Sequence, residues 1–252
     1  MDYDLILQGI LDIGEQMVIG GAEVNRVEDS ITRMCRSYGA TKINVFIITS
    51  NIQVTIKAPD DKIYTQIRRI KDFSVNFDRI DYLNDLSRYI CQHTPEPDEM
   101  HEKLEEVMNR PEQSLVLRFI GAIMVSAGFT VFFGGSFMDA LGAAIMGAVI
   151  ILLDMYLAKR EKNQIVYHFI TSVVGGVAAI FLVKFGIGNN EDLIMIGGIM
   201  LLIPGIAMTN AVRDMLIGDI ASGLLRLVNA LLVAGAIACG FALAIIVLGG
   251  VI

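Results

Sequence analysis

Residues 204–214 read PGIAMTNAVRD, and this stretch decides the fold because it interrupts an apolar segment of the chain. Pro204 lacks a backbone N–H and disfavours helix at Ile203, and Gly205 adds backbone freedom, so we predict that the helix kinks or breaks here. At membrane depth, the second half of a broken helix begins with unpaired N–H groups that suit a carboxylate. A purely structural proline kink is the alternative, since neighbouring helices can satisfy the freed groups.

Five apolar stretches surround this interruption, and each is long enough to cross a bilayer. We expect spans at approximately 116–136, 138–158, 164–185, 192–213 and 224–251. Each reaches the roughly 20 residues that a hydrocarbon core requires. Small residues recur four positions apart, such as Ala143 with Gly147 and Ala236 with Gly240, which lets helices approach closely. The spans are therefore expected to pack as an all-α transmembrane bundle.

Charge is concentrated before these stretches. Residues 1–110 contain 19 of the 27 acidic and 13 of the 20 basic residues, so this part has a net charge of −6 (13 − 19). The two parts suit different solvents, and we predict a cytoplasmic head over residues 1–111 and a transmembrane domain over residues 112–252. The acidic head argues against nucleic acid as a partner.

The head has both helical and strand periodicity. Apolar residues recur at helical spacing in four segments, which are residues 6–17, 24–38, 80–90 and 100–107. Three segments have strand character, which are residues 42–49, 52–56 and 62–70. Asp78 is the expected cap of the third helix. The predicted fold class is an α+β cytoplasmic N-terminal domain followed by an all-α transmembrane bundle of five helices.

Basic residues near the ends of the spans predict the orientation. Seven fall on the side of the head, namely Arg110, Arg118, Lys159, Arg160, Lys162, Arg213 and Arg226. Lys184 alone falls on the opposite side. We therefore expect the N-terminus inside and, after five crossings, the C-terminus outside. Residues 1–4 provide no basic segment before an apolar one, so no cleavable signal peptide is expected.

A set of polar side chains follows the interruption and is the candidate substrate-binding site. Its members are Thr209, Asn210, Arg213, Asp214, Asp219, Ser222 and Arg226. Arg213 could bind a carboxylate with two hydrogen bonds, and Asp214 or Asp219 could bind a cation or a proton. The alternative is an ordinary cytoplasmic loop over residues 213–226, whose charges anchor helix ends at the lipid headgroups.

Other charged residues have simpler interpretations. Asp139 and Asp154 lie near opposite ends of the second span, where their side chains are expected to extend toward the interface. In the head, Glu23 lies at the start of the second helix, where the helix dipole alone explains an acid, and Arg26 beside it is expected to form a local ion pair.

No catalytic constellation is found in this sequence. The three cysteines and three histidines are far apart and lack metal-ligand spacing, and no nucleophile has a base at motif spacing. We therefore expect a protein that is not an enzyme, with no catalytic residues, no metal and no cofactor, and with reduced thiols.

Four stretches resemble the large subunit of the threonine/serine exporter family. They are residues 21–29 with Arg33, Asn84-Asp85-Leu86-Ser87-Arg88, Gly134-Gly135-Ser136 with Asp139, and the run of residues 204–226. The resemblance covers nearly the whole chain. It implies a secondary transporter of a bacterial cytoplasmic membrane that exports small amino acids such as threonine and serine, or small carboxylates such as succinate. It also implies a separate small membrane subunit, because fused members continue with a second block of spans whereas this sequence stops at Ile252.

The sequence therefore predicts an exporter subunit that works by alternating access, with the polar set as its solute site and Pro204 and Gly205 as its hinge. Expected partners are the small subunit, the solute and the lipid bilayer, and a homo-oligomer is a further option. One rival is a membrane-anchored sensor whose cytosolic domain binds a small ligand. Another is a membrane enzyme, for which the sequence offers no candidate residues.

Overall fold

The computed structural model describes residues 2–71, 74–111, 113–158 and 160–249. The described chain is mostly helical and contains one three-stranded antiparallel sheet. It divides into two compact units. The head unit comprises Met1–Glu112 and Ile206–Leu227, and the bundle unit comprises Gln113–Gly205 and Val228–Ile252. Packing thus groups residues 206–227 with the head, whereas the assignment of each part to cytoplasm or membrane stays a prediction.

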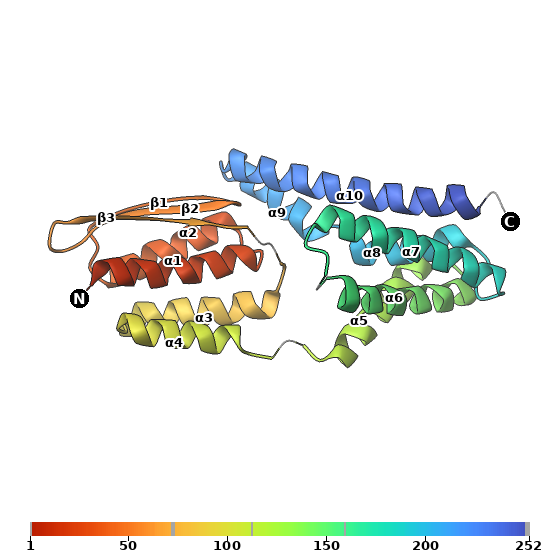
Figure 1. The fold of residues 1–252 in the computed structure, drawn as a ribbon, viewed down its shortest axis with the longest axis horizontal. Helices are drawn as coiled ribbons and strands as arrows, with labels where there is room; N and C mark the ends of the chain where they lie inside the picture. The colour runs from red at the N-terminus through yellow and green to blue at the C-terminus, as the bar shows by residue number, and fades with distance from the viewer. Residues whose placement is uncertain (1, 72–73, 112, 159, 250–252) are drawn as a thin grey trace. The chain divides into compact units, whose positions relative to one another are not determined.

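The N-terminal part of the head unit, called the head below, consists of two helices, a sheet and two further helices. They are α1 (Tyr3–Ile19), α2 (Val24–Ser37), β1 (Lys42–Ile48), β2 (Asn51–Lys57), β3 (Ile63–Arg69), α3 (Phe77–His93) and α4 (Pro97–Met108). Each strand pairs with the next along the chain. Figure 1 shows α1 and α2 between the sheet and the α3–α4 pair. The helical and strand segments predicted for residues 6–107 are therefore confirmed.

The core of the head unit lies between these layers. Ile10 of α1 and Ile31 of α2 are fully buried at the helical spacing of their apolar faces. Ile52 and Val54 of β2 are buried as alternate residues of one strand face, and Leu83 of α3 closes the other side. Removal of this apolar surface from water stabilises the head at about 25 cal/mol per Å².

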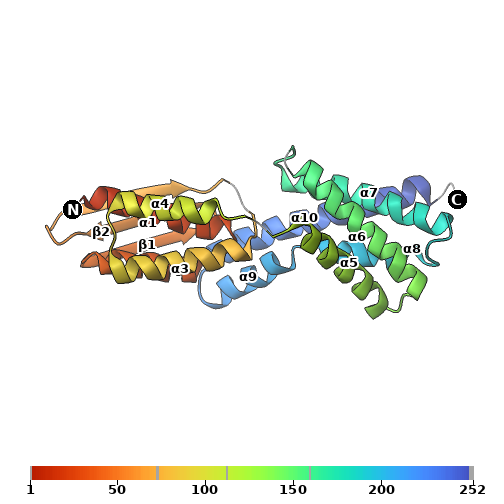
Figure 2. The same ribbon diagram turned by 90° about the horizontal axis from the view of Figure 1, so that it is seen from below.

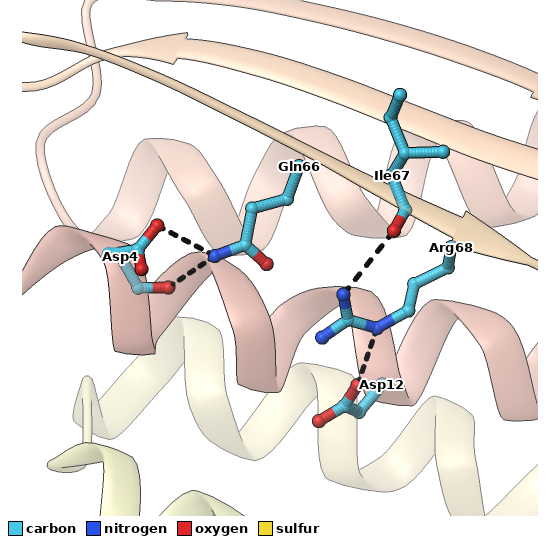
Figure 3. Close-up of polar contacts among 5 residues, drawn as sticks. All are labelled: Asp4, Asp12, Gln66, Ile67 and Arg68. Atoms are coloured by element: carbon cyan, nitrogen blue, oxygen red, sulfur yellow. Dashed lines mark hydrogen bonds and ion pairs between the residues drawn. The ribbon is translucent and has the colours of Figure 1, made fainter.

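Polar side chains join α1 to β3 beside this core (Figure 3). Gln66 Nε2 donates hydrogen bonds to the backbone oxygen and to Oδ1 of Asp4, at 2.9 and 2.8 Å. Arg68 Nε donates to Asp12 Oδ1 at 2.9 Å, and Arg68 Nη1 lies 3.4 Å from the carbonyl oxygen of Ile67. Asp4 and Asp12 lie about two turns apart on α1, whereas Gln66 and Arg68 lie on one face of β3. These contacts therefore fix the sheet along the helix.

The cap of α3 differs from the prediction. Asn76 is the N-cap residue, and its Oδ1 accepts a hydrogen bond from the backbone N–H of Arg79 at 3.0 Å. Asp78 lies in the first turn instead, where its charge suits the helix dipole. The prediction was wrong because Asn and Asp both suit an N-cap, and only the backbone conformation decides between them.

The bundle unit contains helices with apolar surfaces. They are α5 (Leu115–Phe132), α6 (Phe137–Leu157), α7 (Gln164–Lys184), α8 (Glu191–Leu202) and the later part of α10 (Ile220–Leu248). Figure 2 shows α5 to α8 packed beside one another. Within the described residues, four helices are long and apolar enough to span a membrane, or five if α8 and α9 (Gly205–Leu216) form one bent span. The predicted end of the last span, residue 251, lies outside the described residues.

Small residues lie where helices of the bundle unit cross. A Cβ atom added to Gly147 of α6 would lie 3.0 Å from the carbonyl oxygen of Ala122 on α5. One added to Gly240 of α10 would lie 2.7 Å from the carbonyl oxygen of Phe169 on α7. The predicted close approach at small residues is therefore confirmed at both positions.

The two acids of α6 are held by neighbouring elements, and their extension toward the membrane interface stays a prediction. Asp139 is 2% exposed. Its Oδ2 accepts hydrogen bonds from the backbone N–H and the hydroxyl of Ser136, and its Oδ1 accepts from the N–H groups of Asn189 and Asn190, at 2.6–2.8 Å. The carboxylate thus joins the turn before α6 to the turn before α8.

Asp154, at the other end of α6, bonds to the helices on either side. Arg118 Nη2 of α5 donates to its Oδ2 at 2.6 Å, and the Tyr167 hydroxyl of α7 donates to its Oδ1 at 2.8 Å. The sequence did not show this pairing because neither partner is near Asp154 along the chain.

Candidate functional site

The predicted interruption at residue 204 is present. Helix α8 ends at Leu202 and α9 begins at Gly205, with Ile203 and Pro204 outside both helices. Ile203 has φ −57° and ψ 129°, which is the extended conformation that a following proline favours. The break follows from local chemistry. The role of Pro204 and Gly205 as a moving hinge stays a prediction.

Beyond the break, α9 and the first turns of α10 form a close hairpin (Figure 2). Gly218 has φ +105°, a left-handed conformation that glycine adopts without strain, and the next N–H, of Asp219, donates to the carbonyl oxygen of Asp214 at 2.9 Å. A Cβ atom added to Gly223 would lie 2.6 Å from the carbonyl oxygen of Ala211. The hairpin therefore requires glycine at position 223, and it brings the polar residues of both helices together.

A buried ion pair lies inside this hairpin. Asp214 is 0% exposed and Arg226 is 4% exposed, and Arg226 Nε lies 3.4 Å from Asp214 Oδ2. The geometry of this contact is not that of a hydrogen bond. Within the described part of the chain, both carboxylate oxygens of Asp214, and Nε and Nη1 of Arg226, have no hydrogen-bond partner. Because buried charges are costly unless they are fully hydrogen-bonded, this pair favours a binding role over a stabilising one.

The segment of residues 20–23, between α1 and α2, lies against the hairpin. Asn210 Nδ2 of α9 is 3.5 Å from the carbonyl oxygen of Gly21, and Arg213 Nη1 donates to Glu23 Oε1 at 2.6 Å. Arg226 Nη2 lies 3.5 Å from the carbonyl oxygen of the intervening residue, Ala22. The head therefore contributes to the site, which the sequence did not predict.

The remaining members of the predicted set differ in their surroundings. Ser222 is 2% exposed, and its hydroxyl donates to the carbonyl oxygen of Ile47 in β1 at 3.3 Å. Asp219 is half-buried in the turn. Burial of the Glu28 carboxyl group on α2 raises its pKa, and the negative charge of Asp219 raises that pKa further. The side chain of Thr209 is exposed. The structure thus brings Asn210, Arg213, Asp214, Ser222 and Arg226 against the head, and it leaves Thr209 at the surface.

Glu23 and Asn25 belong to the same region, and their role was missed in the sequence. Glu23 is the residue before α2, yet its side chain makes no capping hydrogen bond. Its Oε2, and Oδ1 of Asn25, are buried without a hydrogen-bond partner among the described residues. A signal was present, because Ser, Thr, Asp and Asn are the preferred N-caps, so a Glu at this position suggests another partner for the carboxylate.

The chemistry of the site suits a molecule that carries both charges. Arg226 Nε and Nη1 have no hydrogen-bond partner among the described residues, so its guanidinium has N–H groups that can bind a carboxylate. Asp214 and Glu23 offer oxygens that can accept hydrogen bonds from an ammonium group. Among the described residues, no group of three His, Cys, Asp or Glu side chains could hold a metal ion.

These features define the class of the protein, which is a membrane protein with several apolar helices and a buried charged cluster. The family model described as "Putative threonine/serine exporter" matches residues 8–248, so the chain belongs to the threonine/serine exporter family.

Two curated relatives support this membership. The chain is 22% identical over 244 residues to the "Threonine/serine exporter" of Corynebacterium glutamicum. The matched region covers 92% of this chain and 49% of that protein. It is 25% identical over 246 residues to the "Probable threonine/serine exporter" of Mycobacterium tuberculosis (strain ATCC 25618 / H37Rv). Here the matched region covers 94% of this chain and 46% of that protein. The chain therefore spans about half the length of the curated relatives it matches. No solved structure shows a significant match.

Proposed function

We propose that the chain is a subunit of a secondary transporter that exports small amino acids of the threonine/serine type across the cytoplasmic membrane of a bacterium. Family membership and the four to five apolar helices support transport across a membrane. The observation that carries the proposal is the buried pair of Asp214 and Arg226, whose unpartnered atoms match both charges of an amino acid.

In the proposed mechanism, the solute separates this ion pair. The α-carboxylate binds the guanidinium of Arg226, and the ammonium group donates hydrogen bonds to the carboxylate of Asp214. Arg213 is already paired with Glu23, so Arg226 is the better carboxylate ligand of the two guanidinium groups. Thr209, Asn210, Asp219 and Ser222 complete the proposed substrate-binding set. Its place at a helix interruption is typical of secondary transporters.

Access to the site requires movement. Asp214, Ser222 and Arg226 are all at most 4% exposed, and the head segment of residues 20–23 lies against them. A solute therefore reaches the pair only when the hairpin and the head segment separate. We propose that Pro204 and Gly205 provide the hinge of this alternating access, and that the head faces the cytoplasm, with the N-terminus inside and the C-terminus outside.

A small membrane subunit of the same family is the proposed partner. Secondary carriers commonly assemble two related halves around a solute site, and the apolar helices of this chain supply one half of such an assembly. The solute of the assembled transporter is proposed to be an amino acid; a dicarboxylate such as succinate is the competing solute.

Counterflow of labelled serine, threonine and succinate into vesicles tests this function. The vesicles contain the full chain, with and without the small membrane protein. We expect uptake of serine or threonine by the wild type and loss of that uptake in Arg226→Met. Lys184→Met is the matched control, because Lys184 is an exposed base at the far end of α7. Saturable serine binding without uptake in either preparation would favour the sensor alternative instead.

A further inference from the structure

We propose that Glu23, from the head segment before α2, is a specificity-determining residue that binds the ammonium group of the solute. The proposal rests on the proposed function, because it assigns one more ligand to the same site. It also gives the head a direct part in solute recognition.

The two oxygens of the Glu23 carboxylate have different environments. Oε1 accepts a hydrogen bond from Arg213 Nη1 at 2.6 Å. Oε2 is buried and has no hydrogen-bond partner among the described residues. The side chain is 15% exposed in all. Since nearly all buried carboxylate oxygens are hydrogen-bonded, a carboxylate with one oxygen fixed and the other unused is prepared for a donor from outside the chain.

Glu23 also lies beside the buried ion pair. The carbonyl oxygen of the preceding residue, Ala22, is 3.5 Å from Arg226 Nη2. The charge of Glu23 interacts with those of both Asp214 and Arg226. Among the described residues, the atoms of this region without hydrogen-bond partners are thus mostly acceptors. They are Glu23 Oε2, Asn25 Oδ1 and the two oxygens of Asp214, whereas the donors Nε and Nη1 belong to the guanidinium of Arg226.

This balance of donors and acceptors selects for an ammonium group. An ammonium has three N–H donors and a positive charge, so it satisfies several of these oxygens and reduces the repulsion between the two carboxylates. A dicarboxylate offers only acceptors, and its second carboxylate would approach Glu23 and Asp214 as a like charge. Such repulsion against the wrong ligand is a common source of specificity.

The test compares serine with 3-hydroxypropanoate, which is serine without its amino group, as inhibitors of labelled serine counterflow. The full chain is used, with its small subunit if uptake requires it. We expect the wild type to prefer serine, and Glu23→Gln to lose about 10- to 100-fold of this preference, because the buried charge-assisted hydrogen bond is lost. The amide of the variant can still accept from Arg213. Asp29→Asn is the control, because Asp29 is exposed and paired with Arg33.

A charge-swapped variant separates recognition from structure. Glu23→Arg combined with Arg213→Glu keeps an ion pair between α2 and α9 but removes the carboxylate from position 23. We expect this variant to remain folded and to keep no preference for serine. Recovery of the wild-type preference by the swap, or unchanged preference in Glu23→Gln, would overturn the inference and leave the proposed function standing. A wild type that takes up no amino acid would overturn the proposed function itself.

Discussion

Replacement of either member of the buried pair tests whether Asp214 and Arg226 are energetically coupled as their burial implies. Asp214→Asn leaves the guanidinium without its counter-ion, and Arg226→Met leaves the carboxylate without its own. The double variant Asp214→Asn with Arg226→Met removes both charges. We expect each single variant to be much less stable than the wild type, and the double variant to recover most of the loss.

The magnitude follows from the distance and the burial. At the observed 3.4 Å and an effective dielectric constant of about 20, the two charges attract each other by about 5 kcal/mol. Removal of one member of a buried pair costs about 3–5 kcal/mol, whereas removal of both is often close to neutral. For a chain of this length, the single variants should lower the apparent unfolding midpoint by roughly 6–20 °C. Glu23 stays beside Arg226, so Asp214→Asn should be the milder change.

Thermal unfolding of the purified full chain in detergent, followed by circular dichroism, measures these differences. The chain contains no tryptophan, so the helical signal is the more direct probe. Single variants that each lie within about 1 kcal/mol of the wild type, with additive effects in the double variant, would refute the coupling.

Three further predictions concern other parts of the structure. Gly223→Ala places a Cβ atom 2.6 Å from a backbone oxygen of α9 and should lower the free energy of unfolding by about 1–3 kcal/mol. In the control Gly235→Ala, on the same helix, the new Cβ atom meets no atom within 4 Å, so this change should be neutral or slightly stabilising. Equal unfolding midpoints of the two variants would contradict the close crossing. Asp139→Ala removes the acceptor of four donor groups and should lower the free energy of unfolding by about 1–3 kcal/mol or more in the same assay. The control Asp192→Ala, at an exposed acid, should lower it by less than about 1 kcal/mol. Similar losses in both variants would show that the carboxylate of Asp139 does not join the two turns. Burial raises the pKa of the Cys35 thiol from 9.0 to about 12, so in a variant with the other two cysteines replaced, alkylation at pH 9 should be about 500-fold slower than for an ordinary thiol, which is then half ionised. Because the raised pKa belongs to the folded state, stability should be unaffected below about pH 9 and should fall as the pH rises toward 12; fast alkylation of the native protein would contradict the burial.

Features with local causes could be predicted from the sequence. The strands of the head follow from alternation over a few residues, and the break between α8 and α9 follows from Pro204 and Gly205 alone. Features that depend on tertiary packing could not. Glu23 and Arg213 are 190 residues apart in the chain, and Asp139 is 50 residues from Asn189.

The candidate site was predicted in part for the same reason. The polar set at Asn210, Arg213, Asp214, Ser222 and Arg226 is visible as charge and amide groups beside an apolar stretch. Which of its members are buried is decided by the hairpin and by the head segment that lies against it. Helical periodicity places residues on a face but does not show what that face contacts.

Equilibrium binding of labelled serine to the purified full chain, alone and with its small subunit, tests the central claim most directly. The wild type is compared with the folded double variant Asp214→Asn with Arg226→Met. If the buried pair forms the solute site, the wild type binds serine saturably and the double variant does not. Serine binding of wild-type affinity by the double variant would contradict the account.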